Sequence, residues 1–134
     1  MLNRISSILT GIAAGIGVIF IMEFVSHTMY PLPAGLNPEK MEDMRQIMKQ
    51  MPMGALIMVM VGYFIGALGG GIVCTLMSKE KKFQNVMFVG LILTVFGILN
   101  FMTVPHPMWF MVGSLAVYFA GAFLGYKLTM MIKK

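Results

Sequence analysis

Two residues one helical turn apart, Glu23 and His27, are the strongest candidates for chemistry in this sequence. Glu23 is the only acidic residue inside an apolar segment, where an ionised carboxylate is costly unless it is paired, hydrated or protonated. His27 follows four residues later, so on a helix both side chains project to one side, within reach of each other. An acid and an imidazole placed in this way could take up, relay or release a proton.

Three further polar residues are expected near the same end of the molecule, namely Tyr30, Asn100 and His106. Tyr30 follows the first apolar run, and Asn100 lies close to the end of the third. His106 stands between two prolines, which restrict the backbone and should hold the imidazole in a defined place. We therefore expect one polar site, formed by Glu23, His27, Tyr30, Asn100 and His106.

Three interpretations of this site remain open. In the first, which we favour because burying a carboxylate is costly, Glu23 exchanges protons during transport of a small solute or ion. In the second, Glu23, His27 and His106 bind a divalent metal such as zinc or non-haem iron, in a metal-binding membrane protein or a metal-dependent enzyme. In the third, the same side chains form a polar network in a structural or accessory subunit of a membrane complex.

The composition predicts that these residues are held by membrane-spanning helices. Of the 134 residues, 58% are apolar and only 11% are charged, whereas a soluble domain needs roughly a quarter of its residues charged to cover its surface. Four apolar runs are long enough to cross a bilayer, at about 5–27, 53–77, 86–104 and 108–131. The sequence therefore predicts an all-α fold, with a single domain over 1–134 that is an integral membrane bundle of four transmembrane helices.

Basic residues predict the orientation of these helices, because they resist transfer across the membrane. Three basic residues fall in the first long connection, where three acidic residues offset them. Seven fall on the opposite side: Arg4, Lys79, Lys81, Lys82, Lys127, Lys133 and Lys134. We therefore expect a multi-pass protein of the cytoplasmic (inner) membrane with both termini cytoplasmic and with the polar site at the outer end.

The first outer connection should contain a short amphipathic helix over about 38–51. Asn37 is a candidate cap, followed by a proline suited to a first helical turn. Methionines at 41, 44, 48 and 51 would form one apolar face, so the helix is expected at the outer membrane interface, over the mouth of the bundle.

Small residues spaced by four predict where the long helices pack, because close backbone approach replaces the hydrophobic effect inside lipid. The expected packing positions are seven glycines on three of the helices: Gly11, Gly15, Gly62, Gly66, Gly70, Gly121 and Gly125. A bundle this small encloses little room, so a transport path would form more readily between copies, and we expect a homo-oligomer.

Several functional classes lose support from what the sequence lacks. One cysteine excludes a disulfide framework within the chain, and there is no HExxH, no GxSxG and no glycine-rich phosphate loop. The basic residues are not interleaved with aromatic residues in a stripe, so no nucleic-acid partner is expected. The expected partners are the lipid bilayer, further copies of the chain and a small solute or ion. No cofactor is predicted beyond the divalent metal considered above, and catalysis is less favoured than transport.

Overall fold

The computed structural model describes residues 2–31, 35–37, 39–50, 52–103 and 107–132. The described residues form five helices and no strand. The helices are α1 (Leu2–Met29), α2 (Met41–Gln50), α3 (Met53–Met77), α4 (Lys82–Thr103) and α5 (Met108–Ile132). The predicted all-α fold is therefore confirmed.

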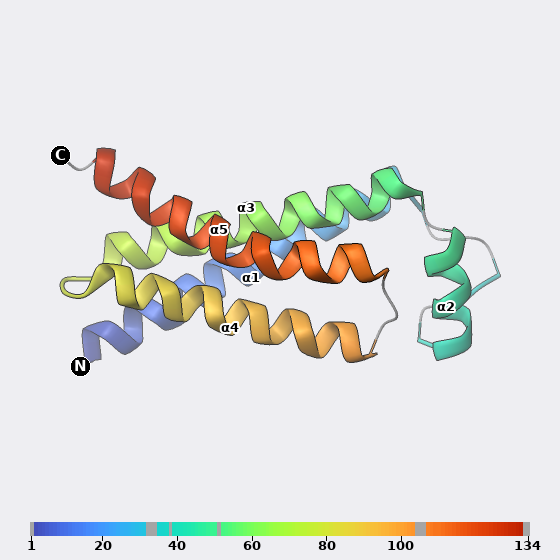
Figure 1. The fold of residues 1–134 in the computed structure, drawn as a ribbon, viewed down its shortest axis with the longest axis horizontal. Coiled ribbons are helices and arrows are strands. Elements are labelled where there is room, and N and C mark those ends of the chain that lie inside the picture. The colour runs from blue at the N-terminus through green and yellow to red at the C-terminus, as the bar shows by residue number, and fades with distance from the viewer. Residues whose placement is uncertain (1, 32–34, 38, 51, 104–106, 133–134) are drawn as a thin grey trace.

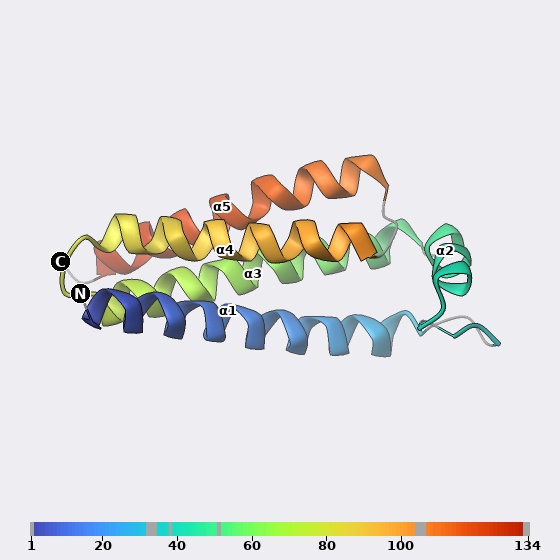
Figure 2. The same ribbon diagram turned by 90° about the horizontal axis from the view of Figure 1, so that it is seen from below.

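The four long helices run side by side along the long axis of the molecule (Figures 1 and 2). Within the described residues, these four are long and apolar enough to cross a membrane. Many of their large apolar side chains are exposed, including Phe24 at 74% and Met131 at 66%, as expected for a surface that faces lipid. The chain is therefore a small membrane protein built on a four-helix bundle.

The two ends of the bundle differ. α1 starts and α5 ends at one end, which we call the terminal end, and α2 lies beyond the other, which we call the α2 end (Figures 1 and 2). α3 has the predicted bounds, whereas α1 and α4 begin earlier than the predicted crossings, at Leu2 and Lys82. Pro52 precedes α3 in an extended conformation, which explains the sharp start of that helix.

Helix α3 is the centre of the bundle, because it packs closely against both α1 and α5. The seven glycines singled out above are all buried. On α1 and α3, Gly11 faces the backbone oxygen of Gly70, and Gly15 faces that of Gly66. Gly62 lies under the side chain of Met22 on α1.

The contact between α3 and α5 is made in the same way. Gly121 faces the backbone oxygen of Phe64, and Gly125 faces that of Leu68. Close backbone approach therefore joins α3 to both of its main neighbours, as is usual where small residues line a helix contact in lipid.

A polar network fixes the terminal end of the bundle. The carboxamide of Asn85 is fully buried, donates a hydrogen bond to Ser78 Oγ at 2.9 Å, and accepts one from Arg4 Nε at 3.0 Å. Asn3 Nδ2 donates a hydrogen bond to the last carbonyl of α3, that of Met77, at 3.0 Å. Because these bonds join α1 to the turn between α3 and α4, the helices are held together at this end.

Helix α2 lies across the α2 end, with its axis transverse to the long helices (Figures 1 and 2). It is shorter than predicted, since it begins at Met41, and positions 38 and 51 lie outside the described residues. Asn37 forms a turn before the helix, with its side-chain oxygen accepting a hydrogen bond from the backbone of Glu39 at 3.0 Å. Among the side chains of α2 that the structure describes, Ile47 is buried and Met41 is half exposed.

Candidate functional site

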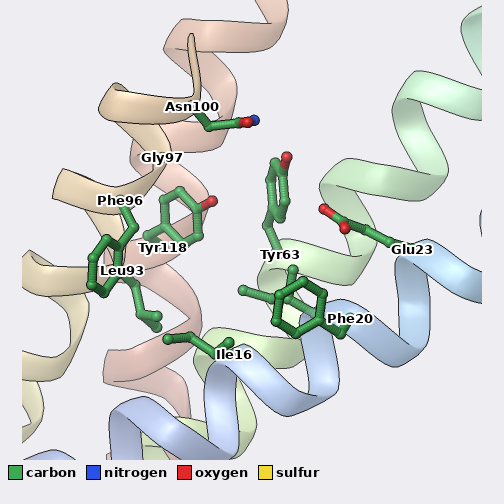
Figure 3. Close-up of a pocket in the computed structure, with 10 residues that line it drawn as sticks. Ile16, Phe20, Glu23, Tyr63, Leu93, Phe96, Gly97, Asn100 and Tyr118 are labelled. Carbon is green, nitrogen blue, oxygen red and sulfur yellow. The ribbon is translucent and has the colours of Figure 1, made fainter. Parts of the chain in front are cut away.

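The main candidate site is a cavity of about 280 Å³ between α1 and α4, toward the α2 end of the bundle. α1 and α4 supply most of its lining, whereas α3 and α5 supply one tyrosine each (Figure 3). The lining residues are Ile16, Ile19, Phe20, Glu23, Tyr63, Leu93, Phe96, Gly97, Asn100 and Tyr118. The cavity is therefore mostly apolar and aromatic, with a few polar groups, which is typical of sites for small molecules.

Glu23 carries the only carboxylate among the lining residues, and it comes from the part of α1 near the α2 end. Figure 3 shows its carboxylate directed toward the cavity, on the side of Tyr63. The side chain is partly exposed, and no group in the described part of the chain forms a hydrogen bond or an ion pair with it. The carboxylate can therefore bind a proton or a ligand that enters the cavity.

Two tyrosines form the deep wall of the cavity. The rings of Tyr63 on α3 and Tyr118 on α5 are stacked, with their centroids 5.2 Å apart and an interplanar angle of 28°. Both residues are only 4% exposed. Figure 3 shows the hydroxyl group of Tyr118 on the side of Tyr63, and that of Tyr63 at the end of its ring nearer to Asn100. No hydrogen bond joins either hydroxyl to another described residue, so both can bind a ligand or water.

Gly97 on α4 makes room for this stack. A Cβ at this position would lie 2.7 Å from Cε2 of Tyr118, closer than real side chains approach. Asn100, one turn further along α4, carries its carboxamide at the rim of the cavity (Figure 3). α4 therefore contributes both space for the tyrosine ring and a polar group.

The structure brings together some of the residues expected in the site and separates others. Glu23 and Asn100 line the same cavity. The side chain of His27 is exposed and does not line the cavity, but it lies close enough to Glu23 to interact with its carboxylate electrostatically. Tyr30 packs instead against the start of α3, where a Cβ at Gly54 would lie 2.8 Å from its hydroxyl oxygen.

His106 lies outside the described residues, so the proposed metal ligands Glu23, His27 and His106 are not placed as a set. Among the residues that are described, no three His, Cys, Asp or Glu side chains gather closely enough to hold a metal ion. A metal site that includes His106 remains a prediction from the sequence.

The site expected from the sequence does not include Tyr63, Tyr118, Phe20 or Phe96, all of which line the cavity. The tyrosines did carry a signal, because each places a hydroxyl group in the middle of an apolar segment. The two phenylalanines carried none, since neighbouring phenylalanines on the same helices have the same chemistry.

Comparison of the chain with protein-family models, with curated proteins and with solved structures finds no match. The fold and the cavity therefore define the class of this protein by themselves. It is a small membrane protein whose four long helices enclose, toward one end, a cavity with a single carboxylate.

Proposed function

We propose that this protein transports a small solute or ion across the membrane, with a proton exchanged at Glu23. One observation carries the proposal. Glu23 lines a largely apolar cavity, and within the described part of the chain its carboxylate has neither a hydrogen bond nor an ion pair, with the exposed imidazole of His27 as an electrostatic neighbour. Since leaving a carboxylate so poorly compensated among apolar helices is costly, a role in binding is the best explanation of it.

The mechanism follows from competition for this carboxylate. When the cavity holds no solute, a proton on Glu23 removes the negative charge from the largely apolar cavity. When a solute with a positive charge or with hydrogen-bond donors enters, it compensates the carboxylate, and the proton is released. The hydroxyl groups of Tyr63 and Tyr118 orient the solute. Because proton and solute exclude one another at Glu23, the movement of one is coupled to the movement of the other.

The orientation proposed for the protein in the membrane rests on the basic residues at the terminal end. Arg4 and Lys79–Lys82 all lie there, so we place that end in the cytoplasm and the cavity in the outer half of the cytoplasmic membrane. A second copy of the chain completes the path, because the cavity within one bundle does not reach the terminal end. Cross-linking in native membranes should therefore yield a homodimer or a larger homo-oligomer.

Proton movement in reconstituted vesicles tests the proposal. Vesicles containing a trapped pH-sensitive dye are exposed in turn to K⁺, tetramethylammonium, chloride and glucose, which represent an inorganic cation, an organic cation, an anion and a neutral solute. We expect at least one probe to change the internal pH in vesicles that contain the wild-type protein. Glu23→Gln, which keeps the size of the side chain, should abolish this change.

The matched control is Glu42→Gln, which alters an exposed carboxylate of α2 and should leave proton movement unchanged. The proposal is wrong if no probe moves protons, or if Glu23→Gln behaves as the wild-type protein does. If the polar groups around Glu23 have a purely structural role, no probe should move protons, and Glu23→Gln should only be less stable than the wild-type protein.

A further inference from the structure

The cavity lies within the bundle and has an opening on the side of the bundle. Phe20 on α1 and Phe96 on α4 both line the cavity, yet 66% and 49% of their surfaces are exposed. Tyr63 and Tyr118, which line the opposite wall, are only 4% exposed. The opening therefore lies between α1 and α4, which carry these two exposed phenylalanines. In a membrane this side of the bundle faces the acyl chains, so a ligand can reach the cavity from the bilayer.

The charge of the lining selects the sign of the ligand. Glu23 is the only charged group, and no Lys, Arg or His belongs to the lining residues. The remaining polar groups are the two tyrosine hydroxyls and the carboxamide of Asn100, all of which are neutral. His27, one turn along α1, interacts electrostatically with Glu23 from outside the lining, but it forms no ion pair with it. An anion in the cavity would therefore meet a carboxylate among apolar groups, whereas a cation would neutralise that carboxylate where the local dielectric constant is low.

The aromatic rings select the shape of the ligand. Four of the ten lining residues are aromatic, namely Phe20, Tyr63, Phe96 and Tyr118. The faces of such rings attract organic cations, quaternary ammonium groups above all, and their apolar bodies accept apolar substituents. A strongly hydrated inorganic ion would gain little from this wall. A volume of about 280 Å³ holds a cationic head with one ring or a short chain, and nothing much larger.

We infer that the cavity binds a small amphipathic organic cation that reaches it from the outer half of the bilayer, between α1 and α4. This inference rests on the proposed function, because it names the class of solute that exchanges with the proton on Glu23. The positive head lies beside Glu23 and the hydroxyl groups of Tyr63 and Tyr118. The apolar body lies between Phe20 and Phe96, at the opening.

Equilibrium binding of a matched pair of probes tests this inference. Phenyltrimethylammonium and tert-butylbenzene have the same shape. The head of the first is centred on a positively charged nitrogen, and that of the second on a neutral carbon. Each is dialysed against lipid nanodiscs that contain the protein, and against empty nanodiscs to subtract partition into lipid. We expect one phenyltrimethylammonium per chain, bound at least about tenfold more tightly than tert-butylbenzene.

Variants then locate the bound probe. Glu23→Gln should weaken binding of the cation by about tenfold and leave the neutral probe unaffected. Phe20→Leu should weaken binding of the cation about threefold, because one aromatic ring at the opening is lost. Its control is Phe24→Leu, one turn further along α1, because Phe24 is 74% exposed and does not line the cavity. Glu23→Asp keeps the charge and should retain most of the binding, which separates loss of charge from loss of folding.

Equal affinity for the two probes, or undiminished cation binding by Glu23→Gln, would overturn the inference. Its failure and that of the proposed function are distinguishable. If phenyltrimethylammonium does not bind while another probe still drives proton movement that depends on Glu23, the substrate class is wrong and proton-linked transport stands. If phenyltrimethylammonium binds but no probe moves protons, the cation site stands and transport is wrong.

Discussion

Replacement of Gly70 by alanine is expected to force α1 away from α3. A Cβ at Gly70 would lie 2.7 Å from the backbone oxygen of Gly11 and 3.4 Å from Cγ1 of Val89. Ordinary contacts between carbon and carbonyl oxygen are about 3.3–3.6 Å, so the two backbones must separate by about 0.6 Å. Because the closest contact is with backbone rather than with a flexible side chain, no change of rotamer relieves it.

A second alanine variant isolates the energy of this clash. Gly17 lies on α1, and a Cβ there meets no described atom within 4 Å. Both substitutions gain the same ~1 kcal/mol of helix propensity when glycine becomes alanine. The difference between the two variants is therefore the cost of forced packing, which is about 1–3 kcal/mol at a tight contact.

The free energy of unfolding of the two variants can be compared in mixed micelles, by titrating a denaturing detergent and following helix content by circular dichroism. Gly17→Ala should be as stable as the wild-type protein or slightly more stable, and Gly70→Ala should be less stable. If Gly70→Ala matches Gly17→Ala, then α1 and α3 do not approach each other at this glycine, and the description of the bundle is wrong.

Two further pairs of variants test the cavity and the terminal end. Gly97→Ala should displace the ring of Tyr118 and weaken binding of phenyltrimethylammonium about fivefold, or ~1 kcal/mol. Its control is Gly90→Ala, where an added Cβ meets only side-chain atoms and none closer than 3.3 Å, so this variant should bind as the wild-type protein does. Equal binding by the two variants would argue against the placement of Tyr118. Asn85→Ala removes a buried carboxamide that bonds a hydroxyl group and a guanidinium group, so detergent titration should show a loss of about 1–3 kcal/mol. Gln84, on the same turn, also accepts a hydrogen bond from Arg4, but this bond is exposed and 3.5 Å long. Gln84→Ala should therefore change stability by less than about 0.5 kcal/mol, and a similar loss in both variants would contradict the role given to Asn85.

The four membrane helices could be predicted from the sequence because apolar length decides them. A run such as Met53–Met77 has no charge and no proline, so it forms one uninterrupted helix, and the structure gives α3 those bounds. The inward position of Glu23 could also be reasoned out, because it continues the row of Gly11 and Gly15, which lie against α3. Spacing along one helix is local information, and the sequence carries it directly.

Which residues line the cavity depends on contacts between helices, and the spacing of residues along one helix does not predict those contacts. The stacking of Tyr63 on Tyr118 depends on how α3 and α5 are rotated, and on the room left by Gly97. Tyr30 lies just beyond the end of α1, where a small change of backbone direction decides whether it joins Glu23 or packs against Gly54. Helix periodicity stops at that point, so the expected neighbours of Glu23 were partly different from those in the structure.

Proton release on binding is the most direct test of the central claim, which is that Glu23 holds either a proton or the solute. Phenyltrimethylammonium is added to nanodiscs in a weakly buffered solution, and the pH is followed with an indicator dye. We predict that the wild-type protein releases protons in proportion to the bound cation and that Glu23→Gln releases none. Cation binding without proton release by the wild-type protein, or equal release by Glu23→Gln, would contradict the claim.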